Sequence, residues 1–386
     1  MEGCHLLFSR LFLLILGHIT KAVSAKSNHT NELEGRVNMA ESITSNRNIA
    51  EYPRNCTFSL EDWTILSKYW YPIAQSSEVT DKPLAVKLLD VNLVVYRTKS
   101  KIVVARDLCV HRGTPLSMGW VEGEEIICPY HGFRYATTGE CTSIPAHPDA
   151  KINPRLCMAV FPIIEKFGLV WTSLTGEFDN LPLFDAWDDP SFQQIVCPNF
   201  EINGSAGRQL EGFLDVAHFA WVHTESFGDR NNAIVPRYQV DNTEYGVHAE
   251  YLSSVSNYPK GAQDLAPKDF EWLRVFDVYP PFTATLKVYF PNDGELWIMN
   301  AACPISARET KLFVPIARNF DKESPIEDVY AFNLQVFMED REMVENQKPE
   351  DLPLDLQMEA HIMADKTSIA YRKALKKLGL GDVYTS

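Results

Sequence analysis

Two segments, Cys109-Val-His-Arg-Gly-Thr-Pro-Leu-Ser117 and Cys128-Pro-Tyr-His-Gly-Phe-Arg-Tyr135, decide which fold this chain adopts. Each segment opens on a Cys that is followed by a His two or three residues later. Two thiolates and two imidazoles can bind a 2Fe-2S cluster, with the thiolates on one iron and the imidazoles on the other. The same four side chains also suit a tetrahedral zinc ion, so the ligand set by itself leaves both metals open.

The residues that flank these ligands favour the iron–sulfur cluster. Residue by residue, the two segments resemble the cluster-binding loops of Rieske proteins. Respiratory Rieske proteins carry an additional Cys in each loop, joined as a disulfide, whereas this chain has Thr114 and Tyr130 at those places. The loops therefore resemble those of Rieske oxygenases and ferredoxins. The resemblance implies that the cluster is bound by Cys109, His111, Cys128 and His131.

The composition is that of a globular protein with room for two domains. The chain has 386 residues, of which 45% are hydrophobic and 23% charged. A net charge of -15 argues against nucleic acid or an anionic membrane as partner, because both require a basic surface. A redox partner with a basic face suits this chain better. The other six cysteines lack the spacing of a disulfide framework and are expected to be free buried thiols: Cys4, Cys56, Cys141, Cys157, Cys197 and Cys303.

The N-terminal segment and the cluster loops favour different cellular compartments for the protein. Leu11-Phe-Leu-Leu-Ile-Leu-Gly17 is an apolar run of signal-peptide length, and small residues up to Ala25 could form a cleavage site. Sequons at Asn28, Asn55 and Asn203 would suit a secreted chain. A cluster is built in a reducing compartment, however, and no twin-Arg pair precedes the apolar run. We expect a cytoplasmic enzyme, with a secretory or membrane-associated location through this segment as the alternative.

The chain divides into three parts, and its fold class is predicted to be α+β. Residues 1–62 form a leader and a flexible extension, because the polar stretch after the leader lacks sustained periodicity. Residues 63–179 contain short β-rich runs separated by polar turns, which predicts a small antiparallel β Rieske domain. Residues 180–386 form the catalytic domain, an antiparallel sheet flanked by helices. The Pro-containing segment 179–200 is predicted to be a linker.

A second group of metal-ligand side chains follows in a predicted helix at about 207–222. Asp215 and His218 share one face of such a helix, whereas His218 and His223 lie roughly 140° apart around it. The two imidazoles can bind one ion only if the helix bends or ends between them. Two His and one carboxylate leave open positions on iron(II), as dioxygen activation requires.

A long helical pattern at about 326–347 offers a third ligand. Phe332, Val336, Asp340 and Val344 recur at steps of four, which places one acid on an apolar face. Such an acid is also typical of a salt-bridged residue, so the pattern alone leaves its role open. The other acids of this helix fall on other faces and are expected to be solvated: Glu339, Glu342 and Glu345.

From about residue 68 to 380 the chain resembles the Rieske non-haem iron oxygenases, in particular the branch of the vanillate O-demethylases and methylxanthine N-demethylases. Besides both metal motifs, the segments Trp70-Tyr-Pro and Glu339-Asp-Arg-Glu-Met-Val-Glu-Asn-Gln-Lys-Pro carry this resemblance. It implies that the mononuclear iron is bound by His218, His223 and Asp340. It also implies that Asp215 is a catalytic residue, not a ligand, which connects a mononuclear-site His to His131 of a neighbouring subunit. Such an electron path implies a head-to-tail homotrimer.

One position departs from this family. Members often have Asn after the Glu that stands here as Glu211, whereas this chain has Gly212. Gly is a weak helix former, and it would let the helix bend or leave room for substrate. The role that the Asn side chain has in other members is therefore in doubt here.

The resemblance implies the oxygenase component of a multicomponent Rieske monooxygenase of aromatic compound metabolism. It would use O2 to hydroxylate, or to remove an N- or O-methyl group from, a small aromatic or heterocyclic substrate. The chain carries no dinucleotide fingerprint, so electrons from NAD(P)H must arrive through a separate reductase, in some systems with a ferredoxin. The alternatives are a ring-hydroxylating dioxygenase, a Rieske electron carrier and a secreted glycoprotein that keeps a degenerate fold.

Aromatic residues of the second domain are expected to line the substrate pocket. They favour a flat substrate, and because few buried charges can be named, the substrate is expected to be neutral. The candidates are Phe213, Trp221, Phe227, Tyr279, Phe282, Trp297 and Phe337.

Overall fold

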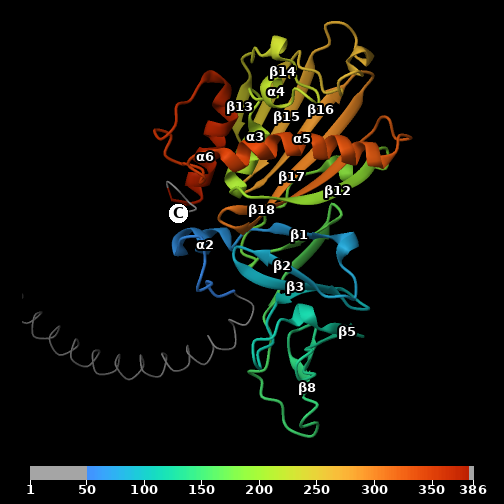
Figure 1. The fold of residues 1–386 in the computed structure, drawn as a ribbon, viewed down its shortest axis with the longest axis vertical. Coiled ribbons are helices and arrows are strands. Elements are labelled where there is room, and N and C mark those ends of the chain that lie inside the picture. Colours follow the sequence, from blue (N-terminus) through green and yellow to red (C-terminus); the bar gives the residue numbers. More distant parts are fainter. Residues whose placement is uncertain (1–49, 382–386) are drawn as a thin grey trace, which may run out of the picture. The chain divides into compact units, whose positions relative to one another are not determined.

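Short runs of β-branched and aromatic residues form most of the structure. In the computed structural model, residues 50–381 are described, and all paired strands among them are antiparallel (Figure 1). The first half contains a three-stranded sheet, β1-β11-β10, and a four-stranded sheet, β2-β3-β4-β9. Their strands are β1 (Tyr71–Gln75), β2 (Leu84–Leu88), β3 (Val91–Arg97), β4 (Ile102–Arg106), β9 (Val160–Phe161), β10 (Ile163–Lys166) and β11 (Leu169–Thr172).

A further four-stranded sheet lies between β4 and β9 in the sequence. It runs β5-β6-β7-β8, with strands β5 (Trp120–Glu122), β6 (Glu125–Ile127), β7 (Arg134–Ala136) and β8 (Cys141–Ser143). The first predicted cluster loop follows β4, and the second connects β6 to β7. Cys109, Cys128 and Tyr135 belong to a small hydrophobic core of this region, separate from the large core of the molecule. The prediction of a small antiparallel β-domain is confirmed.

The second half is built on a seven-stranded sheet in the order β12-β18-β17-β16-β15-β14-β13. Its strands are β12 (Gln193–Ile202), β13 (Gln239–Asn242), β14 (Val247–Ser253), β15 (Trp272–Tyr279), β16 (Thr283–Phe290), β17 (Gly294–Ser306) and β18 (Glu309–Arg318). The helices are α2 (Leu60–Leu66), α3 (Ala206–Leu214), α4 (Phe219–Val222), α5 (Ile326–Asn346) and α6 (Lys366–Lys377). Figure 1 shows α5 crossing one face of this sheet, with α3 and α4 on the same side. The predicted α+β class is therefore confirmed.

Two predictions about the segments before and between the domains differ from the structure. Residues 193–200 are not a linker, because they belong to β12, which pairs with β18 along the edge of the sheet. Pro198 is tolerated there because Cys197 and Phe200 flank an irregularity in the pairing. The folded part also begins before Trp63, since Ala50 and Phe58 are buried in the large core. The predicted leader lies outside the described residues.

The predicted helix at 207–222 is two helices. α3 begins after Ser205, whose hydroxyl accepts a hydrogen bond from the Arg208 N–H, and it ends at Leu214. Asp215 has an extended ψ of 124°, and its carboxylate accepts a hydrogen bond from the Ala217 N–H at 2.8 Å. This side-chain bond replaces the backbone bond that would continue the helix. The chain therefore turns between Asp215 and His218, as convergence of the two imidazoles requires.

Two further sequence expectations can be checked in the described residues. Cys56, Cys141, Cys197 and Cys303 are free thiols, and all of them except Cys56 are buried. None of the helices in residues 50–381 combines the length and apolar character that are needed to cross a membrane.

Candidate metal centres and substrate cavity

The two predicted cluster loops have the same backbone geometry. In the first, the Cys109 N–H donates to the Thr114 carbonyl at 2.8 Å, and the Gly113 N–H donates to the Cys109 carbonyl at 2.8 Å. In the second, the Cys128 N–H donates to the Phe133 carbonyl at 2.9 Å, and the Gly132 N–H donates to the Cys128 carbonyl at 3.0 Å. Gly113 and Gly132 occupy equivalent places with φ of 76° and 69°, which a glycine adopts without strain. The matching turns bring the two pairs of candidate ligands to one place.

The four candidate cluster ligands differ in exposure. Both cysteines are buried, whereas His111 is half-buried and His131 is exposed. The two imidazole rings lie 4.7 Å apart, and the ring of His111 stacks on Phe133. Burial, followed by the neighbouring Cys109, raises the pKa of the Cys128 thiol in the metal-free chain. A donor set of two buried thiols and two more exposed imidazoles fits a Rieske cluster.

A tyrosine lies against one cluster cysteine. The Tyr135 hydroxyl is 3.1 Å from Cys109 Sγ, and both side chains are buried. With a thiolate as partner, the hydroxyl is the donor of this hydrogen bond. Hydrogen bonds to the sulfurs help to set the potential of an iron–sulfur cluster.

The second candidate centre consists of His218, His223 and Asp340. The Nε2 atoms of the two imidazoles lie 3.0 Å apart, and they are 3.3 and 3.2 Å from Asp340 Oδ1. Ligands of a single ion with bonds near 2.1 Å are about 3.0–3.4 Å apart, so these atoms are spaced for one metal. The three side chains occupy one side of such an ion and leave the remaining positions open.

Each of these imidazoles has a carboxylate behind it. Asp215 Oδ2 is 3.5 Å from His218 Nδ1, and Glu339 Oε2 is 2.8 Å from His223 Nδ1. A carboxylate in this place holds the proton on Nδ1 and turns the Nε2 lone pair toward the metal position. Both imidazoles are therefore oriented for the same ion.

The electrostatics of this centre favour a cation. Burial disfavours the imidazolium, yet Asp215 and Asp340 together raise the pKa of His218 to about 10 in the metal-free chain. Burial also opposes ionisation of Asp215, but the hydrogen bonds from His218 and Ala217 outweigh it and lower the pKa of this carboxyl. A divalent ion would replace the proton as the positive charge among these groups.

The role of Glu339 is a correction to the sequence analysis. Glu342 is exposed as expected, whereas Glu339 is largely buried and accepts hydrogen bonds from His223 and Ser226. Glu345 is not simply solvated either, since its carboxylate accepts a hydrogen bond from the Asn203 N–H at 2.8 Å. The acids were assigned by helix face alone, and the partners of Glu339 come from a segment more than one hundred residues earlier. Only the position of α5 beside α4 reveals them.

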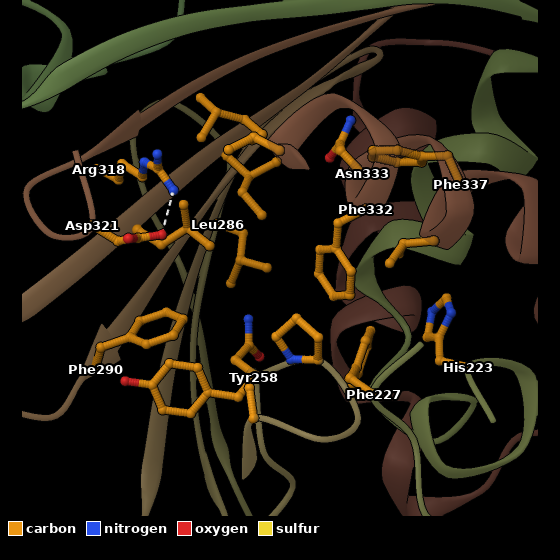
Figure 2. Close-up of a pocket in the computed structure, with 18 of the residues that line it drawn as sticks. His223, Phe227, Tyr258, Leu286, Phe290, Arg318, Asp321, Phe332, Asn333 and Phe337 are labelled. Carbon is orange, nitrogen blue, oxygen red and sulfur yellow. Dashed lines mark hydrogen bonds and ion pairs between the residues drawn. The ribbon is translucent and has the colours of Figure 1, made fainter. Parts of the chain in front are cut away.

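A cavity of about 520 Å³ begins at this centre, since His218, His223 and Asp340 all line it. The rest of its wall comes from the sheet, from α5 and from the loop after β14, and most of it is apolar. Figure 2 shows His223 on one side of the cavity and Arg318 with Asp321 on the other, with Leu286 and Phe332 between them. The volume is suitable for a small ring compound.

The pocket prediction was correct in part. Of the seven aromatic candidates, three line the cavity: Phe213, Phe227 and Phe337. Trp221 is exposed, Phe282 is buried in the core, and Tyr279 borders a different hollow. Trp297 lies on the opposite sheet face from Leu296 and Ile298, and it contacts Phe184. The sequence analysis missed Tyr258, Phe290 and Phe332, because only the folded sheet and α5 bring these rings together.

The departure at Gly212 has no effect on the cavity. Gly212 borders a separate polar hollow with Asp215, Arg208 and Arg372, and α3 continues past it to Leu214. A Cβ atom there would meet Val344 Cγ2 at 3.5 Å, an ordinary contact. Gly212 therefore makes neither a bend nor room for substrate.

The chain matches two domain families. Residues 69–162 match the Rieske 2Fe-2S domain, and residues 202–380 match the vanillate O-demethylase oxygenase C-terminal domain. Over 324 residues the chain is 33% identical to methylxanthine N1-demethylase NdmA of Pseudomonas putida, which covers 81% of this chain and 89% of the relative. Over 339 residues it is 32% identical to methylxanthine N3-demethylase NdmB of the same organism, with 84% and 92% covered.

A solved structure agrees with these sequence matches. The structure of Pseudomonas putida CBB5 NdmA with caffeine superposes with a TM-score of 0.72 at 32% identity, and it covers 81% of this chain and 91% of that chain.

We expect the Glu339→Gln variant to bind iron(II) at the mononuclear site about 10–100-fold more weakly, because His223 loses the carboxylate that orients it. Iron(II) titration of protein stripped of the mononuclear ion measures this. Glu342→Gln, on the exposed face of the same helix, is the matched control and should bind as the wild type does. Equal affinity in the two variants would contradict the role given to Glu339.

We expect Tyr135→Phe to keep the cluster but to lower its reduction potential. The lost hydrogen bond stabilises the more negative, reduced cluster, and a net worth of about 1–1.5 kcal/mol corresponds to about 40–60 mV for one electron. Spectroelectrochemical titration measures the shift. Tyr130→Phe, on the exposed tip of the second loop, should leave the potential unchanged. An unchanged potential in Tyr135→Phe would show that the hydroxyl does not act on the cluster.

Proposed function

This chain belongs to the Rieske non-haem iron oxygenases, in the family of the methylxanthine N-demethylases, and on that premise we propose that it removes N- or O-methyl groups oxidatively from a small ring compound. It is the oxygenase component of a multicomponent Rieske monooxygenase. The observation that supports the finer proposal most strongly is the convergence of His218, His223 and Asp340 on the wall of a largely apolar cavity.

We propose that Cys109, His111, Cys128 and His131 hold the cluster, and that His218, His223 and Asp340 hold a mononuclear iron(II). When bound, the iron supplies dioxygen activation and the cluster supplies electrons one at a time. The overall reaction is balanced by two electrons and two protons, since a methylated substrate and O2 give the demethylated product, formaldehyde and water.

The chain's own residues position the substrate for this reaction. Phe332, Phe337 and Leu286 line the same cavity as the metal ligands, and their apolar surfaces would exclude water from the methyl group. A ring held between α5 and the sheet presents its edge to the metal position. The cavity wall thereby selects which C–H bond reacts.

The separation of the two candidate metal sites is the observation behind the proposed homotrimer. In Figure 1 the β5–β8 sheet lies away from α4 and α5, so the two metal sites of one chain are remote from each other. The Asp215 side chain is one-third exposed beside an open polar hollow, and His131 and Tyr130 are exposed on the second cluster loop. We propose that the neighbouring subunit places its cluster loop against Asp215, which connects that cluster to His218 by hydrogen bonds.

The remaining parts of the proposal concern partners and location. Electrons come from NAD(P)H through a separate reductase. A cytoplasmic location is part of the proposal because a Rieske cluster is built in a reducing compartment, and the buried thiols of Cys197 and Cys303 fit such a compartment.

The rival functions have less support. A Rieske electron carrier has no use for two histidines and an aspartate that converge within 4.8 Å of one another. A ring-hydroxylating dioxygenase would produce a cis-diol and no formaldehyde.

Two measurements test the proposed function. Anaerobically purified protein should contain about three irons per chain, with a Rieske signal in the reduced state, as two cluster irons and one mononuclear iron require. With a reductase, NADH and O2, it should release formaldehyde from N-methyl or O-methyl ring compounds. If the protein contains two irons per chain and does not take up a third when iron(II) is added, the electron carrier would be the better interpretation. A cis-diol product would exclude the monooxygenase.

We expect Asp215→Ala and Asp215→Asn to retain all three irons while formaldehyde release falls about 100-fold or more, because the carboxylate that connects the subunits is lost. Iron analysis and product release are measured on the same preparations. Asp215→Asn is included because its side-chain oxygen can still accept the Ala217 N–H and keep the turn. Glu225→Gln, an exposed acid after His223, is the control. Normal turnover in both Asp215 variants would refute the electron path.

A further inference from the structure

Two arginines are buried in the sheet wall of the cavity. Arg274 on β15 is 1% exposed and Arg318 on β18 is 6% exposed, and both line the cavity. They occupy the two ends of one cross-strand row, in which Arg274 pairs with Val288, Val288 with Leu296, and Leu296 with Arg318. The sheet therefore presents an apolar centre with a guanidinium on each side.

The charge of Arg274 has no acidic partner. Its guanidinium donates to Ser253 Oγ at 3.2 Å, to the Val255 carbonyl at 2.8 Å and to Asn257 Oδ1 at 3.0 Å. All three acceptors are neutral, and no carboxylate of residues 50–381 forms an ion pair with it. Burial lowers the pKa of this guanidinium to about 10. The guanidinium also lies 5.4 and 6.0 Å from the ring centroids of Phe219 and Tyr251, and these cation–π contacts offset part of the cost of burial. Because rings do not neutralise a charge as a carboxylate does, this site remains suited to an anion that the described chain does not supply.

The guanidinium of Arg318 has partners for only some of its hydrogen-bond donors. Its Nε donates to Gln193 Oε1 at 3.0 Å, and its Nη1 lies 3.2 Å from Asp321 Oδ2. The Asp321 side chain is 55% exposed, so solvent weakens its compensation of the guanidinium charge. Nη2 is buried and has no hydrogen-bond partner in the part of the chain that the structure describes. An unpaired buried donor is costly as well.

The position of Arg318 indicates which end of a substrate it would meet. Figure 2 shows it across the cavity from His223, with the apolar side chains of Leu286 and Phe332 between them. A ring that directs its methyl group to the metal position would direct the opposite substituent to Arg318. A guanidinium binds a carboxylate through charge-assisted hydrogen bonds, which are stronger than neutral ones.

We propose that the substrate is an aromatic or heterocyclic carboxylate, and that Arg318 binds its carboxylate at the end of the cavity remote from the metal while Arg274 adds a positive charge that no carboxylate of the described residues neutralises. This inference rests on the proposed function, and it replaces the expectation of a neutral substrate. Arg318 is thus a specificity-determining residue, because it selects among methylated compounds by the charge that they carry opposite the methyl group.

Calorimetric binding of two matched probes to the full-length protein, without O2, tests the proposal. 4-Methoxybenzoate and 4-methoxybenzamide share the ring and the methyl ether and differ in charge. We expect the wild type to bind the benzoate about tenfold more tightly or better, as charged hydrogen bonds allow. Equal affinities, or a preference for the amide, would overturn the proposal without any variant.

The variants assign that preference to residues. Arg318→Met should bring the ratio of the two affinities close to one, and Arg274→Met should lower it. Arg318→Lys keeps the charge and should keep part of the ratio, which preserves the test if the Met variant does not fold. Arg308→Met is the matched control, since Arg308 is paired with Asp351 and 55% exposed outside the cavity. A wild-type ratio in folded Arg318→Met would overturn the role of Arg318.

The readout is separate from turnover, so the two proposals can fail independently. Formaldehyde release from neutral methylated rings, with no charge preference in binding, would overturn the carboxylate inference and leave demethylation standing. A charge preference that depends on Arg318, without formaldehyde from any methylated probe, would support the cavity assignment and contradict demethylation.

Discussion

The hydrogen bond from the Ala217 N–H to the Asp215 carboxylate is the interaction on which the mononuclear site depends. It ends α3 and lets the chain turn before α4, so that His218 and His223 direct their Nε2 atoms to one point. On a continuous helix these rings would point in different directions. The same carboxylate lies behind His218, so one aspartate shapes the backbone and orients an imidazole, and its side chain is still one-third exposed.

Helix α5 supplies the remaining side chains of the candidate metal site. From one helix it supplies Asp340 beside the two imidazoles, Glu339 behind His223, and Phe332 and Phe337 on the cavity wall. The sheet supplies the opposite wall, because alternate residues of its strands face α5. The candidate metal site and the cavity thus share one helix, and a substrate between α5 and the sheet would lie beside the proposed metal. The buried Arg274 and Arg318 lie at the two ends of one row of this wall, and the proposed charge selectivity rests on them.

The cluster region is built as a separate unit with its own small core. Its two loops use the same turn, with a glycine four residues after each cysteine, and this geometry depends on local sequence alone. Figure 1 shows the β5–β8 sheet away from α4. This separation of the two candidate metal sites within one chain is the reason for the proposal that electrons pass between subunits.

The sequence by itself determined the local chemistry. The positions of the candidate ligands, the inward-facing Asp340 and the α+β class follow from short-range spacing and from strand and helix periodicity, whereas the cluster and the iron that they would bind follow from the resemblance to a family. The contacts of Glu339 and the burial of Arg274 and Arg318 in one cavity wall were decided only by the tertiary structure. Glu339 acts on a histidine that lies more than one hundred residues away, and the two arginines become neighbours of one cavity only through strand register. Periodicity shows which residues face inward, but burial of a charge has meaning only once its partners, or their absence in the described residues, are known.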